Sequence, residues 1–255
     1  MEVLLALPAG GAVPAEGPAL TCAHMAYRVG PGPRLLGVRL PEGLQGGMML
    51  LDCAGFDGSG DPTDCCSQIL GECRRRGYTG IVCDFDSPPT GCLGQLVSIL
   101  DRHCSGEGWA LHVPEAYASF APAARVLIPS SVTSGSLERR LRAALERYGP
   151  ARPVLAVQWL REDLPLPAGG RGTPITQAAL DGQIRRLEPA IFFDKGLCAH
   201  YYTYMLQGGQ AHFVVFDTAR SIQAKVALAR RLSLPAVLMA APEVGGSLPV
   251  ILGES

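Results

Sequence analysis

Short apolar runs alternate along the chain with segments in which apolar residues recur every three or four positions. The runs predict eight strands, at about 2–7, 20–28, 48–53, 80–86, 109–113, 124–129, 153–159 and 236–240. The segments with helical spacing predict helices over about 61–77, 91–104, 136–149, 173–187 and 221–232. From residue 48 onward strands and helices alternate, which indicates βα units and a parallel sheet.

Several predicted helices carry residues that commonly begin or end a helix. Asp61 precedes Pro62 at the start of the first helix, and Gly77 follows its last turn. Thr173 and Pro174 would open the fourth helix in the same way. These signals support the assignment of helices between the apolar runs.

Two regions interrupt the alternation. Residues about 198–217 contain two aromatic-rich runs around a glycine turn, which predicts an inserted β-hairpin before the last βα unit. The first 47 residues contain strand-like runs but no convincing helix. Eight strands therefore predict an α/β fold, an abbreviated (β/α)8 TIM barrel that forms a single domain over 1–255. A dinucleotide-binding fold would need GxGxxG after the first strand, and "LPAGGAVPAEG" lacks it.

Composition limits the classes of partner. The chain has 255 residues, 47% of them hydrophobic, which is enough to bury a sizeable core. With 22 basic and 23 acidic residues the net charge is −1, so no broad positive field would attract nucleic acid or an anionic membrane surface. We expect neither nucleic acid nor membrane as a partner.

The N-terminal run and the cysteines bear on location. "MEVLLALPAGG" has an apolar run shorter than the roughly 7–15 residues of a secretory core and lacks its basic flank. No run approaches the roughly 18 apolar residues of a membrane span, so we expect no signal peptide and no transmembrane segment. Nine cysteines, several in periodic segments, favour a reducing compartment. Their spacing does not indicate a metal site, and no cofactor motif is present.

The stretch "YTGIVCDFDSPPT", residues 78–90, carries the clearest candidate chemistry. Side chains alternate along a strand, so those at 81, 83 and 85 share one face, while Val82, Asp84 and Asp86 share the other. The apolar face suits packing against outer helices. The two carboxylates then point to the carboxyl-end mouth of the barrel, where catalytic residues of such barrels lie.

Two interpretations of this pair are open. Carboxylates two residues apart on one face are close enough for one to raise the pKa of the other, as general acid catalysis requires. Alternatively, the pair is a hydrated strand end that caps loop amides, since carboxylates with shifted pKa also occur in structural networks.

The order and wording of the strands resemble the glycoside hydrolases of family 18, the chitinase-like TIM barrels. The resemblance is closest to the branch of spore-associated N-acetylglucosaminidases that act on cortex peptidoglycan. It rests on "LTCAHMAYRVGPGPRLLG", "LLDCAG", "GYTGIVCDFD" and "LHVP", which match the second to fifth strands. The most specific match is "CAHYYTYMLQGGQAHFVVFDTARSIQAKVALARRLSLP", residues 198–235.

The resemblance implies roles for the two carboxylates. In that family the fourth-strand motif DGxDxDxE ends in a glutamate that protonates the glycosidic oxygen. The aspartate two residues earlier orients the N-acetyl group of the substrate, which supplies the nucleophile. By position, Asp84 matches the orienting aspartate and Asp86 stands where the glutamate belongs. The partner implied is an N-acetylated glycan, peptidoglycan in particular.

Three departures from the family pattern affect the chemistry. Asp86 is one methylene shorter than glutamate, and Thr79 and Val82 replace the first two motif acids. In "IPSS", Ser130 and Ser131 stand near the tyrosine and aspartate that hold the N-acetyl group. On the last strand, the tryptophan floor is replaced by the residues at 239 and 240, Met and Ala. The motif is degenerate, and the chain is a pseudoenzyme candidate.

Four further residues are candidates for substrate binding. Asp52 ends the third strand and should point to the mouth, where it either offsets the missing motif acids or caps a loop. Trp159 and Glu162 follow the seventh strand, where the resemblance implies an aromatic sugar contact, although a packed tryptophan is equally compatible. Tyr204 in the predicted hairpin either lines a glycan cleft or packs in the sheet.

Three hypotheses about function follow. The first is a substrate-assisted glycosidase with Asp86 as acid and Asp84 as orienting residue. The second is a non-catalytic barrel that binds glycan or a protein partner through the same mouth. The third is a structural or assembly protein of a spore-forming cell. The location expected under these hypotheses is cytoplasmic or spore-associated.

Overall fold

The computed structural model describes residues 1–11, 20–38, 40, 44–89, 91–167 and 172–253. The chain divides into two compact units. The first comprises Met1–Ile128, Ala143–Ala156 and Ser233–Glu243, and the second comprises Pro129–Arg142, Val157–Leu232 and Val244–Ser255. The expectation of a single domain over 1–255 stays a prediction.

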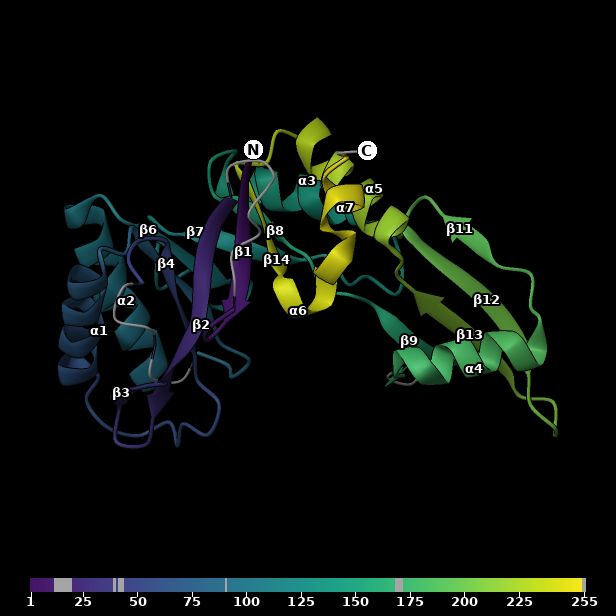
Figure 1. The fold of residues 1–255 in the computed structure, drawn as a ribbon, viewed down its shortest axis with the longest axis horizontal. Coiled ribbons are helices and arrows are strands. Elements are labelled where there is room, and N and C mark those ends of the chain that lie inside the picture. The colour runs from purple at the N-terminus through teal and green to yellow at the C-terminus, as the bar shows by residue number, and fades with distance from the viewer. Residues whose placement is uncertain (12–19, 39, 41–43, 90, 168–171, 254–255) are drawn as a thin grey trace. The chain divides into compact units, whose positions relative to one another are not determined.

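Eight parallel strands form a closed barrel, as the apolar runs predict. In order around the barrel they are β1 (Glu2–Pro8), β2 (Leu20–Gly30), β4 (Met48–Asp52), β5 (Gly80–Asp84), β6 (Ala110–Pro114), β7 (Arg125–Pro129), β8 (Pro153–Ala156) and β14 (Ala236–Ala240). Strand β1 pairs in parallel with both β2 and β14, which closes the ring (Figure 1). A short strand, β3 (Arg34–Gly37), adds to β2 in the antiparallel sense. The predicted TIM-barrel fold is confirmed.

Alternating side chains separate the barrel interior from an outer layer. Inside the barrel pack Leu4, Ala23, Leu50, Val82 and Leu127, with others of the same inner faces. The outward-facing residues of β4 and β5 pack instead against α1 (Thr63–Arg76) and α2 (Gly91–Glu107). Burial of these two apolar layers is the main force that stabilises the barrel.

Cysteines are part of the outer layer. Cysteines 53, 65, 66, 73, 83 and 104 pack there among aliphatic side chains, and all nine cysteines of the chain are free thiols. Burial raises the pKa of Cys66 to about 11 and that of Cys73 to about 12, so both thiols are neutral. They serve as small apolar residues, as their periodic spacing predicts.

The connections between the strands differ in the helices that they contain. Helix α3 (Leu137–Tyr148) follows β7, and α5 (Ala219–Arg231) precedes β14. After β14 come the short elements α6 (Ala241–Val244), η2 (Gly245–Ser247) and α7 (Leu248–Leu252). Between β6 and β7 the chain has only the single turn η1 (Glu115–Tyr117). None of the helices among the described residues has the length and apolar character needed to cross a membrane.

The second unit contains a five-stranded antiparallel sheet. Its order is β10 (Thr173–Pro174), β9 (Arg161–Leu166), β13 (Ala211–Phe216), β12 (Ala199–Met205) and β11 (Phe192–Asp194). Strands β12 and β13 are the predicted hairpin, in register from His200 opposite Phe216 to Met205 opposite Ala211. Helix α4 (Gln177–Leu187) packs on one face through Leu180 and Ile184 against Tyr202 and Val214. The predicted hairpin is therefore the centre of a larger sheet.

Two boundaries differ from the prediction. Thr173 and Pro174 pair with β9 as an edge strand, and helix α4 begins later, capped by the Thr176 hydroxyl, which accepts the Ala179 N–H at 3.1 Å. Proline has no backbone N–H to donate, and at the edge of a sheet no neighbouring strand requires that hydrogen bond. The predicted seventh strand, 153–159, ends as β8 at Ala156.

His112 lies inside the barrel below the mouth. It is fully buried on β6, in register with Val82 on one side and Arg125 on the other. Neither ring nitrogen has a hydrogen-bond partner among the described residues. Burial, and then the positive charge of Arg125, lower the pKa of His112 to about 4, against a smaller opposing effect of Glu2. His112 is therefore a core residue.

The lowered pKa of His112 predicts a loss of stability in mild acid. The unfolded chain takes up this proton near pH 6.5 and the folded chain only near pH 4, so stability present above pH 6.5 is lost as the pH falls toward 4. The effect is on the order of 3 kcal/mol. In His112→Leu the free energy of unfolding, measured by urea denaturation from pH 7 to 4, should fall less steeply than in wild type.

His103→Leu is the matched control, because His103 is an exposed histidine on α2. It should keep the wild-type pH slope. An equal slope in His112→Leu and in wild type would contradict the assignment.

Candidate active site

Asp84 is the last residue of β5 and is exposed at the mouth of the barrel. The alternation that places it there is visible in the packing. Val82 belongs to the interior cluster, whereas Ile81 and Cys83 belong to the outer layer. Asp84 therefore continues the inner face beyond Val82, as predicted.

Asp86 follows two residues after the end of β5 and is also exposed. The backbone on either side of it is anchored. The Phe85 ring packs edge-on against Tyr117 with their centres 5.5 Å apart, and the Tyr117 hydroxyl donates to the Ser87 carbonyl at 2.7 Å. This loop therefore holds Asp86 in a defined place close to Asp84.

Three charged residues occupy one register row at the mouth. Arg28 on β2 is opposite Asp52 on β4, and Asp52 is opposite Asp84 on β5. The Arg28 Nε donates to Asp52 Oδ1 at 3.1 Å, and the Ala54 N–H donates to the same oxygen at 2.9 Å. Asp52 therefore pairs with Arg28 and caps its own loop. That Asp52 offsets the missing motif acids stays a prediction.

A β-bulge brings Arg28 to the inner face. The register between β2 and β4 shifts between Met25 and Tyr27. Met25 is opposite the inward-facing Leu50, and after the shift Tyr27 is opposite the outward-facing Leu51, which leaves Arg28 opposite Asp52. Strict alternation from Met25 would have turned Arg28 outward. The alternation of side chains along the sequence therefore does not predict that Arg28 faces the mouth.

The electrostatics of this row favour a proton on Asp84. Partial desolvation at the mouth raises the pKa of the Asp84 carboxyl, and the negative charges of Asp86 and Asp52 raise it further. Arg28 donates to Asp52 rather than to Asp84. A carboxyl with a raised pKa keeps its proton to higher pH than an ordinary aspartate, and the protonated form can donate a hydrogen bond to a ligand or transfer the proton.

A pocket of about 230 Å³ lies beside the row. Its lining includes the charged residues Arg28 and Asp52 and the apolar residues Met25, Leu36 and Val38. Such a combination suits a ligand with both hydroxyl or amide groups and small apolar parts. In the part of the chain that the structure describes, no cluster of His, Cys, Asp and Glu could hold a metal ion.

The positions that depart from the family pattern have other contacts. In the first unit, Ala240 on β14 faces the interior and Met239 is buried on the opposite face. In the second unit, Ser130 accepts the Gln158 N–H at 3.0 Å, and Ser131 donates to the Gln158 side chain. The two serines thus bind the segment after β8.

Trp159 belongs to a buried polar centre in the second unit. Its indole N–H donates to the Asp217 carbonyl at 3.1 Å. The Asp217 carboxylate accepts from the Leu160 N–H at 2.9 Å and from the Ser221 hydroxyl at 2.7 Å, and it pairs with Lys225 at 2.6 Å. Both charged side chains are fully buried. Trp159 is only partly buried, so its role in binding stays a prediction.

Glu162 and Tyr204 lie on opposite faces of the second-unit sheet. Glu162 is opposite Val215, on the face that carries Leu160 and Ala199. Tyr204 lies on the face covered by α4, and its hydroxyl donates to Asp163 at 2.7 Å. Burial and this bond raise the pKa of Tyr204 to about 12. The structure does not bring the two residues together, and their roles in binding stay predictions.

No protein-family model and no curated protein matches the chain. Solved structures do match. The chitinase of Chromobacterium violaceum is 16% identical, with a TM-score of 0.64 over 92% of this chain and 90% of that one. The spore cortex-lytic enzyme SleL of Bacillus megaterium is 16% identical, with a TM-score of 0.59 over 93% of this chain and 69% of that one.

A plant class V chitinase mutant from Cycas revoluta, solved in complex with (GlcNAc)3, is 13% identical, with a TM-score of 0.60 over 100% of this chain and 98% of that one. Chitinases and spore enzymes are the two groups that the sequence resembles. At these identities the likeness shows a shared fold, and at that level the resemblance is confirmed.

The raised pKa of Asp84 predicts that its charge destabilises the fold. Below the ordinary aspartate pKa, Asp84 is neutral in both the folded and the unfolded chain and does not lower the free energy of unfolding. As the pH rises through the raised pKa of the folded state, the free energy of unfolding falls. Asp84→Asn should therefore raise the urea midpoint at pH 7 and leave it nearly unchanged at pH 4. Asp64→Asn, a change at an exposed aspartate on α1, is the control. A midpoint at pH 7 no higher than that of the control would contradict the assignment.

The buried Asp217–Lys225 pair predicts a large loss of stability in Lys225→Met. Removal of one partner leaves a buried carboxylate without its counter-charge, which costs about 3–5 kcal/mol. Lys195→Met removes an exposed lysine and should change the free energy of unfolding by less than about 0.5 kcal/mol. Similar losses in both variants, measured by urea denaturation, would exclude a central role for the pair.

Proposed function

We propose that the protein is a glycoside hydrolase family 18-like barrel that binds N-acetylglucosamine-containing glycan, of the peptidoglycan type, at the carboxyl-end mouth. Hydrolysis is slow in the natural chain, because the acid is too short. The observation that carries the proposal is the place of Asp84, which lies on the inner rim of the barrel with its pKa raised by partial burial and then by the charges of Asp86 and Asp52.

The proposed roles follow from the geometry and from the family resemblance. Asp84 keeps its proton to higher pH than an ordinary aspartate, which suits a hydrogen bond to the N-acetyl group of the sugar. Asp86, in the anchored loop between Phe85 and Ser87, is the acid directed at the glycosidic oxygen. The substrate supplies the nucleophile, so no second carboxylate has to attack the sugar.

Arg28 and Asp52 complete the proposed binding site. The row of Arg28, Asp52 and Asp84 offers donors and acceptors at one level of the mouth, where sugar hydroxyl and amide groups can bind. The pocket next to it has Met25, Leu36 and Val38 for the apolar face of a sugar or its acetyl methyl group. Trp159, Glu162 and Tyr204 remain proposed glycan contacts of the second unit.

Two observations support impaired turnover. The first is the length of Asp86, since a misplacement of about 1 Å can lower a rate on the order of 100-fold. The second is that Ser130 and Ser131 bind Gln158, so they do not supply free groups for an N-acetyl group. The second observation also favours the alternative function, a non-catalytic barrel whose mouth binds glycan or a protein partner.

Restoring the length of the acid distinguishes the two functions. In Asp86→Glu, release of reducing sugar from N-acetylated peptidoglycan fragments should rise about 10- to 100-fold over wild type. In Asp86→Ala it should fall to background, while calorimetric binding of N-acetylglucosamine oligomers should persist, because Asp84, Asp52 and Arg28 are unchanged.

Asp64→Glu is the matched control for side-chain length, and it should leave the rate unchanged. Binding without turnover in both wild type and Asp86→Glu would favour the non-catalytic barrel. Neither binding nor turnover in any variant would contradict a glycan function.

A further inference from the structure

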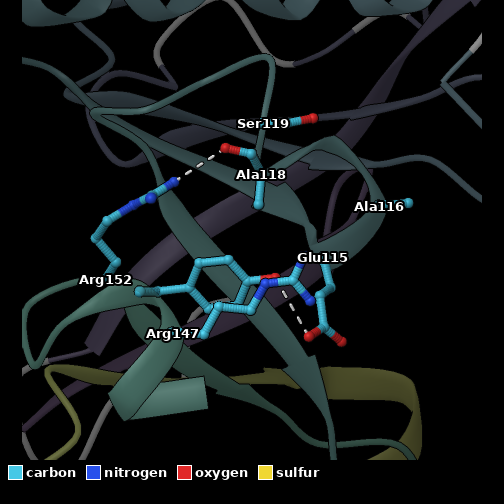
Figure 2. Close-up of a pocket in the computed structure, with 7 residues that line it drawn as sticks. Glu115, Ala116, Ala118, Ser119, Arg147 and Arg152 are labelled. Atoms are coloured by element: carbon cyan, nitrogen blue, oxygen red, sulfur yellow. Dashed lines mark hydrogen bonds between the residues drawn. The ribbon is translucent and has the colours of Figure 1, made fainter. Parts of the chain in front are cut away.

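The connection from β6 to β7 leaves a second pocket on the first unit, with a volume of about 640 Å³. After the single turn η1 the chain runs without a helix to Arg125, so this side of the barrel has no helical cover from the connection itself. Glu115, Ala116, Ala118 and Ser119 line it from the connection, and Arg147, Tyr148 and Arg152 line it from the end of α3 and the segment after it. Figure 2 labels all of these except Tyr148.

Arg152 is a fixed part of the wall. Its Nε donates to the Ala124 carbonyl at 2.7 Å, and its Nη2 donates to the carbonyls of Ala121 at 2.9 Å and Ala118 at 3.3 Å. Figure 2 shows the guanidinium directed at Ala118. These bonds hold the connection in place, and they neutralise none of the positive charge of Arg152, because carbonyls carry no net charge.

A second guanidinium lies close to the same tyrosine. Arg147 lies over the Tyr148 ring at 5.2 Å from its centre, and Arg152 lies over it at 5.5 Å. Burial raises the pKa of Tyr148, so the ring adds no negative charge at neutral pH. Two guanidinium groups therefore lie around one neutral ring, and Glu115 is the one carboxylate in the lining. The formal charge of the lining residues is still positive, which favours an anion.

The pocket also offers donors that are not used. Arg147 and Ser119 are both exposed, and neither side chain makes a hydrogen bond to any residue that the structure describes. The Tyr148 hydroxyl is directed instead at Glu115, to which it donates at 3.4 Å. Arg147 and Ser119 are thus the groups able to contact a ligand, while Arg152 and Tyr148 shape the wall.

We infer that this pocket binds a small oxyanion, the phosphate or carboxylate group of a small molecule. The planar guanidinium of Arg147 donates hydrogen bonds to two oxygens of the oxyanion, and the Ser119 hydroxyl donates a further one. Arg152 contributes a fixed positive charge. The methyl groups of Ala116 and Ala118 leave room for the body of the ligand. The site is independent of the glycan site proposed at the mouth.

Nuclear magnetic resonance titration of the full chain tests the inference. Sodium phosphate and sodium acetate are added separately, with sodium chloride at matched ionic strength as the reference. The Arg147 Nε–Hε resonance should shift and saturate with phosphate, with acetate or with both, but not with chloride. Which of the two salts saturates at the lower concentration identifies the preferred oxyanion.

Variants distinguish a specific oxyanion site from a general electrostatic attraction of anions to the protein. Arg147→Gln should weaken the oxyanion affinity at least about tenfold. Arg102→Gln removes an exposed positive charge on α2 outside the pocket, so it should bind as wild type does. Equal weakening in Arg147→Gln and Arg102→Gln, or no saturation with either oxyanion, would overturn the inference.

Discussion

The pairing of β1 with both β2 and β14 is the constraint on which the rest of the structure depends. It closes eight parallel strands into a ring, so their carboxyl ends meet at one mouth. Without that closure Arg28, Asp52 and Asp84 would mark the edge of an open sheet. With it they form a charged row on the inner rim, above an interior filled by Leu50, Val82 and their neighbours. The same closure buries His112 inside the barrel.

Asp217 and Asp84 differ in how their negative charge is compensated. Asp217 is fully buried and receives the Lys225 ammonium, the Ser221 hydroxyl and the Leu160 N–H, so its charge is compensated. Asp84 has two acidic neighbours, and its pKa is raised. The first arrangement stabilises the fold, and the second reduces stability at a place where a ligand can reach it. Carboxyl groups with a raised pKa beside other acidic residues are typical of functional sites.

The sequence predicts the barrel better than it predicts the chemistry. Its eight apolar runs and the helices over α1, α2, α3 and α5 are confirmed, because burial in two layers requires those patterns. The most specific stretch of resemblance, 198–235, contains Asp217, Ser221 and Lys225, which form a structural centre. That stretch therefore indicated the fold and left the catalytic question open.

The features that the sequence did not predict have non-local causes. Strand β9 contains Arg161, Glu162 and Asp163, and it forms because β13, some fifty residues later, pairs with it. Arg28 faces the mouth because of the β-bulge between Met25 and Tyr27, and the pattern of apolar residues does not predict this bulge. The opposite faces taken by Glu162 and Tyr204 likewise depend on pairing register. Local spacing carries none of this information.

We propose that Asp84, whose pKa is raised, contacts an N-acetylated glycan at the mouth of the barrel. The most direct measurement is the carboxyl carbon resonance of Asp84 followed through a pH titration, with and without an N-acetylglucosamine tetrasaccharide. We expect a midpoint above the ordinary aspartate value and a clear change in the resonance when the glycan is added. An ordinary midpoint together with no response to the glycan would contradict it.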